Sequence, residues 1–175
     1  LTDDEREGES KDVIERVMVA SKQIAIDAAD RGTEIHKGAE SIMLGQAWNQ
    51  DDPQLVAINE WKDANIIEVD YTEKVLLNHE IGYGGTADLK ADHQQSGRTV
   101  IDLKSQNCKP GANGKPRANF YPAFVLQLAA YAAVEGGGIP VASLIVDKNS
   151  PTVFEKLWTE EQVAAAFEAF KCLHG

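Results

Sequence analysis

The chain has 175 residues, 43% of them hydrophobic, which suits one well-packed domain and is too short for two. No run approaches the roughly 18 consecutive apolar residues of a membrane span, and the acidic start LTDDERE does not resemble a secretory signal. We therefore expect a single domain over residues 1–175, soluble and cytoplasmic with no membrane partner, and the net charge of −11 excludes a protein that coats nucleic acid through a generally basic surface.

The first half of the chain is predicted to contain helices followed by strands. Residues 11–44 place apolar side chains at helical spacing, and Gly32 is expected to break this segment into two helices. Three strands follow, at residues 65–77, 82–93 and 98–106. The sequence QSGR between the last two indicates a tight turn, so these strands should form an antiparallel hairpin.

The second half is predicted to begin with a mobile loop at residues 108–119, where Gly, Pro and Asn are frequent. A helix ended by glycines follows at residues 119–138, and then two strands at residues 141–148 and 152–158. A capping threonine opens the last helix, residues 159–174. These elements predict an α/β fold in which helices flank a central mixed β-sheet on both sides.

The strand at residues 98–106 carries Asp102 and Lys104 among side chains that favour burial. Burying these charges costs several kcal/mol unless a partner compensates. With Gly97 in the left-handed position of a three-residue loop, paired positions of the hairpin sum to 192, and Asp88 lies opposite Lys104. A sum of 190 would place Asp88 opposite Asp102 instead. In both registers, alternation puts these three charged side chains on one face.

The same alternation assigns the apolar neighbours Ala87, Leu89, Ile101 and Leu103 to the opposite face. Two carboxylates within about 5 to 8 Å of each other repel, and one lysine neutralises only one of them. Two interpretations follow: an Asp–Lys pair solvated at a sheet edge, or a divalent cation held between the carboxylates. Mg²⁺ prefers oxygen ligands, and together with a phosphate substrate it suits phosphodiester cleavage.

A stretch without acidic residues begins at this strand. Residues 103–134 contain no Asp or Glu, and their cations all lie in the first half: Lys104, Lys109, Lys115 and Arg117. The stretch is either an ordinary solvated loop or a contact surface for phosphates. On the second interpretation, Lys109, Lys115 and Arg117 bind DNA.

Four motifs, in this order of the chain, resemble the PD-(D/E)xK nuclease superfamily. RGTEIH is similar to a G-x-x-x-H helix motif, GYGGTADL to the G-x-x-D motif, VIDLK to the D/E-x-K motif, and QLAAY to a Q-x-x-x-Y helix motif. The two helix motifs are typical of the branch that includes RecB-type nuclease domains, CRISPR-associated exonucleases and the mitochondrial genome maintenance exonuclease. The motifs lie within residues 32–131, over half of the chain. The resemblance implies a restriction-endonuclease-like core.

The resemblance also implies the residues of a site that uses Mg²⁺ or Mn²⁺. The implied metal ligands are His36, Asp88, Asp102 and the backbone carbonyl of Leu103. The implied catalytic residues are Asp88, Asp102, Lys104, Gln127 and Tyr131, where the last two lie one helical turn apart and orient the active site or the DNA. The roles of Glu40, one turn after His36, and of Glu73, similar to a glutamate that often precedes the G-x-x-D strand, stay open.

The implied function is a metal-dependent DNA exonuclease that hydrolyses phosphodiester bonds in phage or bacterial recombination, repair or DNA processing. Its substrate would be a single strand or a duplex end. Unwinding would need a recombination or helicase partner, because the chain lacks a G-x-x-x-x-G-K-[ST] motif. Only Cys108 and Cys172 are present, so we expect no iron–sulfur cluster of the four-cysteine kind found in many CRISPR-associated members.

Three alternatives stay open at this point. One is a structure-specific endonuclease of the same fold. The second is a DNA-binding module that has lost catalysis, and the third is a metal-dependent hydrolase of small phosphate esters. Each predicts a different outcome in a cleavage assay with metal and DNA.

Overall fold

The computed structural model describes residues 29–174. The chain divides into two units, residues 1–34 and 35–175, and the fold below is that of the second unit. The prediction of one domain over the whole chain stays a prediction. Gly32 does not break a helix, because it lies among helical residues on both sides; the part of the predicted N-terminal helices before residue 29 lies outside the described residues.

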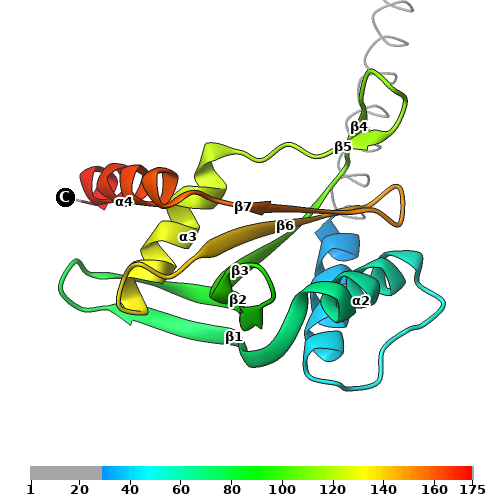
Figure 1. Ribbon diagram of the computed structural model, residues 1–175, viewed down its shortest axis with the longest axis horizontal. Coiled ribbons are helices and arrows are strands. Elements are labelled where there is room, and N and C mark those ends of the chain that lie inside the picture. Colours follow the sequence, from blue (N-terminus) through cyan, green and yellow to red (C-terminus); the bar gives the residue numbers. More distant parts are fainter. Residues whose placement is uncertain (1–28, 175) are drawn as a thin grey trace, which may run out of the picture. The chain divides into compact units, whose positions relative to one another are not determined.

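A five-stranded mixed sheet forms the centre of the second unit (Figure 1). The strands lie in the order β1-β2-β3-β6-β7, with β3 and β6 parallel and the other neighbours antiparallel. Their bounds are Ile66–Asn78 for β1, Tyr83–His93 for β2, Gly97–Gln106 for β3, Val141–Asp147 for β6 and Val153–Leu157 for β7. All five were predicted within a few residues of these bounds, and the mixed α/β fold is confirmed.

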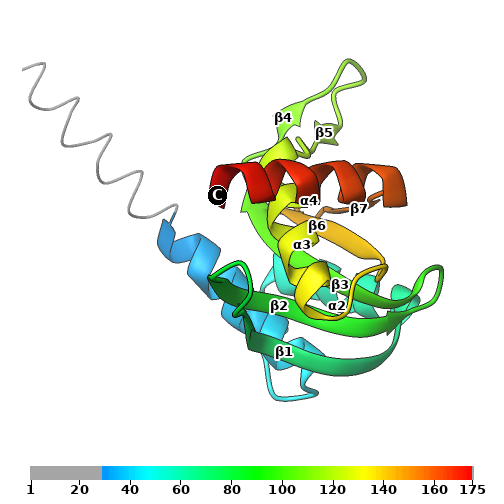
Figure 2. The same cartoon turned by 90° about the vertical axis from the view of Figure 1, so that its left-hand side faces the viewer.

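Helices cover both faces of this sheet (Figure 2). One face packs against the helix of residues 35–43 and against α2 (Pro53–Asn65), and the other against α3 (Pro122–Val134) and α4 (Glu160–His174). Helix α2 was not predicted from the sequence. Its signals are Asp52, whose side chain accepts hydrogen bonds from two backbone N–H groups of the first turn, and a proline at the first helical position.

The two cores lie on opposite faces of the sheet. The first core, beside the helix of residues 35–43, contains Leu89, Ile101, Leu103 and Leu144 among its sheet residues. The second core, beside α3 and α4, contains Ala87, Val100 and Val141. Strands β3 and β6 are covered on both faces, so their central residues are almost all buried.

The predicted cap of the last helix is confirmed. Thr159 Oγ1 accepts the N–H of Gln162 at 3.2 Å, and the Thr159 N–H donates to Gln162 Oε1 at 3.1 Å, which makes a reciprocal capping box. Among residues 29–174, no helix combines the length and the apolar character needed to cross a membrane.

The hairpin of β2 and β3 has the register whose paired positions sum to 190. Leu89 pairs with Ile101 and His93 pairs with Gly97, so the preferred sum of 192 is wrong and the alternative of 190 is confirmed. Gly97 has the predicted left-handed conformation, with φ of 69°, but it begins β3 instead of ending the loop. The loop is therefore residues 94–96.

Buried His93 explains why the loop begins one residue earlier than predicted. Its Nδ1 accepts the N–H of Gln95 at 3.2 Å, and its carbonyl accepts the N–H of Ser96 at 3.2 Å. These hydrogen bonds fix His93 as the last paired residue of β2. A buried histidine that organises a turn is not visible as a pattern in the sequence.

The predicted loop at residues 108–119 contains a small two-stranded hairpin. Its strands are β4 (Lys109–Pro110) and β5 (Pro116–Arg117), and Lys109 pairs with Arg117. Figure 1 shows this hairpin extending the chain that leaves β3. The segment therefore carries its cations on a defined backbone.

Candidate metal and active site

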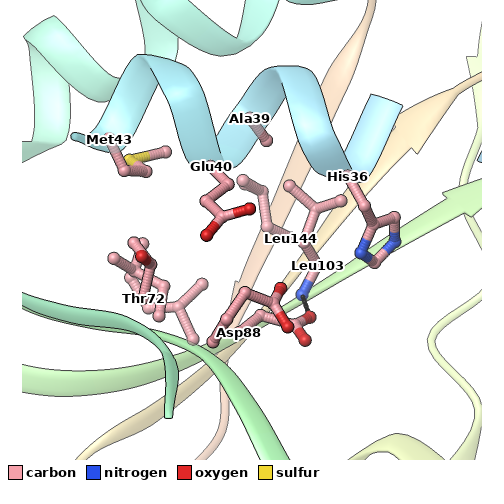
Figure 3. A pocket seen from close by; sticks show the side chains of 11 residues that line it. His36, Ala39, Glu40, Met43, Thr72, Asp88, Leu103 and Leu144 are labelled. Atoms are coloured by element: carbon pink, nitrogen blue, oxygen red, sulfur yellow. Dashed lines mark hydrogen bonds between the residues drawn. The ribbon is translucent and has the colours of Figure 1, made fainter. Parts of the chain in front are cut away.

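A small hollow lies between the helix of residues 35–43 and the sheet (Figure 3). Its polar lining residues are His36, Glu40, Thr72, Glu73 and Asp88. Its apolar lining residues are Ala39, Met43, Leu89, Ile101, Leu103 and Leu144. Apolar walls lower the local dielectric constant, so charges inside the hollow interact more strongly than they would in water.

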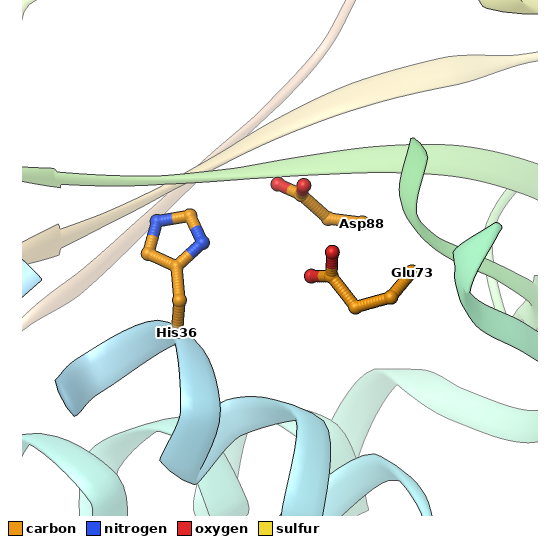
Figure 4. A group of neighbouring side chains, drawn as sticks. All are labelled: His36, Glu73 and Asp88. Carbon is orange, nitrogen blue, oxygen red and sulfur yellow. The ribbon is translucent and has the colours of Figure 1, made fainter. Parts of the chain in front are cut away.

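Three side chains in this hollow form a candidate metal site (Figure 4). His36, Glu73 and Asp88 each offer one ligand atom, and these atoms lie within 4.8 Å of one another. Neighbouring ligands of an octahedral Mg²⁺ are separated by about 3 Å, and opposite ones by about 4 Å. A small closure of the three side chains would therefore suit a cation of this size.

The backbone of β1 turns Glu73 into the hollow. Its φ of 47° is the one positive value among the non-glycine residues that the structure describes. Successive strand residues normally point to opposite faces, yet Thr72 and Glu73 both line the hollow. A left-handed conformation costs a residue with a side chain on the order of 1 to 3 kcal/mol, and such strain is concentrated at functional sites.

A matching irregularity in β2 turns Asp88 to the same hollow. Asp88 and Leu89 both line it, whereas Ala87 belongs to the second core on the other face. The prediction that Asp88 shares a face with Asp102 and Lys104 is therefore wrong: Asp88 lies on the face of Ile101 and Leu103, between and beside which Asp102 and Lys104 alternate to the other face. The prediction that Ala87 shares the Leu89 face is wrong as well. The ladder between β2 and β3 ends at the pair Leu89–Ile101, and beyond it Asp88 Oδ2 accepts the N–H of Leu103 at 2.7 Å.

That hydrogen bond takes the place of one in the sheet. If the register continued, Ala87 would face Leu103 and a backbone carbonyl of β2 would accept this N–H. The carboxylate of Asp88 does so instead. The N–H and carbonyl of one strand residue point to the same side, so the Leu103 carbonyl also faces the end of the ladder. Its role as a metal ligand stays a prediction.

Asp102 and Lys104 form an ion pair outside the group of His36, Glu73 and Asp88. Lys104 Nζ lies 2.7 Å from Asp102 Oδ1, and Asp102 is 1% exposed. The interpretation of a pair solvated at a sheet edge is therefore wrong for Asp102. Its other oxygen, Oδ2, is buried without a hydrogen-bond partner among the described residues. Such an atom is rare unless an ion, a water or a proton satisfies it.

Burial dominates the electrostatics of this region. It raises the pKa of Asp102 to about 6, with Lys104 opposing the shift and the charge of Asp88 adding to it. Burial is also the largest cause that raises the pKa of Glu73, followed by the negative charges of Asp88 and Glu40. A divalent cation would relieve this repulsion between carboxylates.

The pKa of His36 is lowered, chiefly by burial and further by the positive charge of Lys104, while Asp88 acts in the opposite direction. A lowered pKa favours the neutral imidazole, which is the form that binds metals. The neutral nitrogen donor of His36 and the repelling carboxylates of Glu73 and Asp88 fit a hard divalent cation.

Gln127 and Tyr131 belong to α3 and do not line the hollow. Gln127 Nε2 donates to the Tyr131 hydroxyl at 2.9 Å, and Tyr131 is buried in the second core. The Tyr131 ring packs on Gly85, where an added Cβ would come within 2.7 Å of the hydroxyl oxygen. Gly85 is the glycine of the G-x-x-D segment, three residues before Asp88. Tyr131 therefore contacts the strand that carries Asp88.

The predicted DNA-binding residues Lys109, Lys115 and Arg117 are exposed on the β4–β5 hairpin. The base of this hairpin is tied to the end of β3, because Gln106 Nε2 donates to the Asn119 carbonyl at 3.1 Å and the Asn119 N–H donates to Gln106 Oε1 at 2.8 Å. The hairpin that carries these three cations is therefore anchored to β3, the strand that contains Asp102 and Lys104. Their contact with DNA stays a prediction.

The structure also gives positions to the two residues whose roles stayed open. Glu40 lines the hollow, and Glu73 belongs to the candidate metal group. The similarity of Glu73 to a family glutamate was the one signal for it in the sequence. Its inward direction depends on the left-handed backbone, which no sequence pattern indicated.

The chain matches no protein-family model and no curated protein. Similar solved structures include one described as "Crystal structure of SSO0001", with a TM-score of 0.43 and 16% sequence identity over 92% of this chain and 68% of that chain. This likeness is too low to support a fold family or an activity. The motifs and the geometry of the site therefore remain the basis for a function.

Proposed function

We propose that the protein is a DNA exonuclease of the PD-(D/E)xK type, with a restriction-endonuclease-like core and Mg²⁺ or Mn²⁺ as its cofactor. The observation that carries the proposal is the position of Asp88. Its carboxylate lies beside His36 and hydrogen-bonds to Leu103, the residue between Asp102 and Lys104. Three of the four sequence motifs therefore converge where the β2–β3 ladder ends.

In this proposal His36, Glu73 and Asp88 would hold the cation. Asp102 and the Leu103 carbonyl are further ligands that the sequence resemblance implies. When bound, the cation would supply a Lewis acid that polarises a phosphate oxygen. His36 contributes a neutral donor because burial lowers its pKa. The carboxylates contribute the negative charge that makes the site selective for a divalent cation.

Lys104 would act on the substrate. Its Nζ pairs with the buried Asp102, and its side chain is 29% exposed, so part of the Lys104 side chain is accessible from the surface. A fixed positive charge at this place stabilises the charge that develops on the phosphate during cleavage. Gln127 and Tyr131 would act as positioning residues, because Tyr131 supports Gly85 and thereby the start of the Asp88 segment.

The exposed cations of the β4–β5 hairpin favour a polymeric substrate over a small phosphate ester. A recombination or helicase protein as partner, and a role in phage or bacterial recombination or repair, stay predictions. A protein of this kind would degrade DNA that another process has opened or cut.

Cleavage of end-labelled linear DNA and covalently closed circular DNA tests the proposal. We expect Mg²⁺ or Mn²⁺ to support release of labelled nucleotides from linear DNA, little nicking of circles, and no reaction in EDTA. Rapid linearisation of circles would indicate the endonuclease instead. DNA and metal binding without cleavage would indicate the inactive module, and hydrolysis of a small phosphodiester without competition by DNA would indicate the third alternative.

Two variants separate metal binding from catalysis in this assay. Asp88→Asn should abolish both cleavage and Mn²⁺ binding measured by calorimetry. Lys104→Ala should lower turnover by orders of magnitude and leave Mn²⁺ affinity unchanged or higher, because a positive charge near the cation has gone. Glu60→Gln on the exposed face of α2 is the matched control and should change neither quantity.

A further inference from the structure

An exposed aromatic ring lies at the start of α3, directly after the cationic hairpin. Tyr121 is 50% exposed, and its ring meets the ring of Phe124 with centroids 5.4 Å apart and planes at 89°. Tyr121 is the N-cap residue of α3, yet its side chain makes no capping hydrogen bond. The contact with Phe124 orients the Tyr121 ring, while half of the residue stays accessible.

The backbone before Tyr121 is fixed relative to β3. The side chain of Gln106 holds both the N–H and the carbonyl of Asn119, at 2.8 and 3.1 Å. Gln106 follows Lys104 by two residues, which is roughly 7 Å along an extended strand. The ring is therefore attached, through two residues of chain, to a point close to the candidate active site.

Phe120, the residue before Tyr121, belongs to a second group of rings and cations. Phe120 and Phe154 line a hollow together with two hairpin cations, Lys115 and Arg117. Lys156 on β7 adds a cation, with its Nζ 5.8 Å from the centroid of the Phe120 ring. Aromatic and cationic side chains from the hairpin and from β7, the edge strand, therefore lie around Phe120.

The charge of this surface differs from that of the whole chain. Residues 103–134 contain no acidic residue, whereas the chain has a net charge of −11. A polyanion would be repelled by most of the molecule and attracted here. Charge complementarity thus selects a nucleic acid as the occupant, and the exposed ring selects the form of that nucleic acid.

We propose that this surface binds single-stranded DNA, with a base stacked on Tyr121 and the neighbouring phosphates held by Lys115 and Arg117. The inference rests on the proposed function and specifies the form of its substrate. A cationic groove beside stacking aromatic rings is the usual arrangement for single strands. A base inside a duplex is covered by its neighbours and cannot stack on the ring without being unstacked, so the surface favours a single strand over a duplex.

Binding of a single-stranded oligonucleotide of about ten nucleotides, containing one 2-aminopurine, tests the stacking. EDTA in the buffer prevents cleavage. We expect wild-type protein to quench the 2-aminopurine fluorescence, which reports base stacking. Tyr121→Leu should weaken binding by about tenfold and lose the quenching, whereas Tyr121→Trp should retain both. Leu77→Ala removes another exposed apolar side chain, 56% exposed on β1, and should change nothing.

A pair of arginines, one on the hairpin and one on β3, tests the charge. Arg117→Ala on the hairpin should weaken binding several-fold and reduce its salt dependence. Arg98→Ala, at the start of β3 with a side chain 67% exposed, is the matched control and should not.

The outcomes separate this inference from the proposed nuclease function. Equal affinity of wild type and Tyr121→Leu, or tighter binding of a duplex of the same sequence, would overturn the stacking site even if the wild type cleaves DNA with Mg²⁺. Binding that depends on Tyr121 in a protein that cleaves nothing would support the stacking site and reject the nuclease.

Discussion

At the scale of single residues, the site brings together side chains that destabilise the fold in the absence of a cation. Asp102 is buried with one unsatisfied oxygen, and Glu73 has a left-handed backbone. Both features cost free energy. A strained backbone and a buried oxygen without a hydrogen-bond partner are each expected where a ligand compensates them.

Asp102→Asn should make the metal-free protein more stable at neutral pH. The Asp102 pKa is about 6 in the folded protein and 3.8 ordinarily, so the folded state binds the proton more tightly. The stability of the wild type then falls as pH rises from about 4 to 6. The gain in the variant has an upper limit of roughly 3 kcal/mol at pH 7, since Lys104 also loses its partner.

Urea denaturation in EDTA at several pH values measures this difference. The unfolding free energies of wild type and Asp102→Asn should agree best near pH 4 and diverge toward pH 7. Parallel stability curves over this range would contradict the raised pKa. Cleavage by the variant should be abolished at every pH, because the carboxylate has gone.

Glu73→Gln should lower Mn²⁺ affinity by about tenfold, since the amide keeps the shape of the side chain and removes its charge. Calorimetry measures the affinity without any need for cleavage. Glu40→Gln is the matched control, because Glu40 lines the same hollow but is not in the three-residue group. Equal effects of the two substitutions would mean that Glu73 acts only through its charge.

At the scale of elements, the contact between β2 and α3 links two motifs that lie far apart in the sequence. The Tyr131 ring occupies the space that a side chain at residue 85 would need, so a glycine fits this position. The irregular turn of Asp88 toward the hollow follows three residues later. Helix α3 therefore supports the geometry of the site from the opposite face of the sheet.

Gly85→Ala should destabilise the protein by about 1 to 3 kcal/mol, because the buried Tyr131 ring has little room to move. Tyr131→Leu in the same chain should recover part of this loss. Tyr131→Phe should recover less, since a ring carbon would still lie 2.9 Å from the added Cβ. A double-mutant cycle by chemical denaturation measures the coupling. Independent, additive effects of the two positions would exclude the contact.

At the scale of the whole molecule, an acidic protein presents one stretch without acidic residues. Neutralising Lys109, Lys115 and Arg117 together should weaken DNA binding for every sequence alike. The slope of log affinity against log salt should become less steep by up to about 0.7 for each phosphate of a single strand that the variant no longer binds. Lys171→Ala removes a positive charge from α4 and is the control, which should leave the slope unchanged. An unchanged slope in the triple variant would remove the hairpin from the DNA path.

Hydrophobic patterning was sufficient to predict the five strands, α3 and α4, because burial of one or both faces leaves a direct record in the sequence. It did not reveal α2, whose start is marked instead by the capping Asp52 and the proline that follows it. It also placed the hairpin loop one residue late, because the hydrogen bonds of buried His93 depend on the folded turn.

The sequence by itself determined the mixed α/β fold, the positions of the charged residues on their elements, and the stretch that carries cations without acids. These follow from local periodicity and composition. Only the tertiary structure decided that Glu73 joins His36 and Asp88, and that Asp88 leaves the regular alternation of β2. The physical reason is that both depend on local departures from regular strand geometry: the Asp88 side chain replaces a backbone acceptor where the β2–β3 ladder ends, and Glu73 on β1 has a left-handed φ.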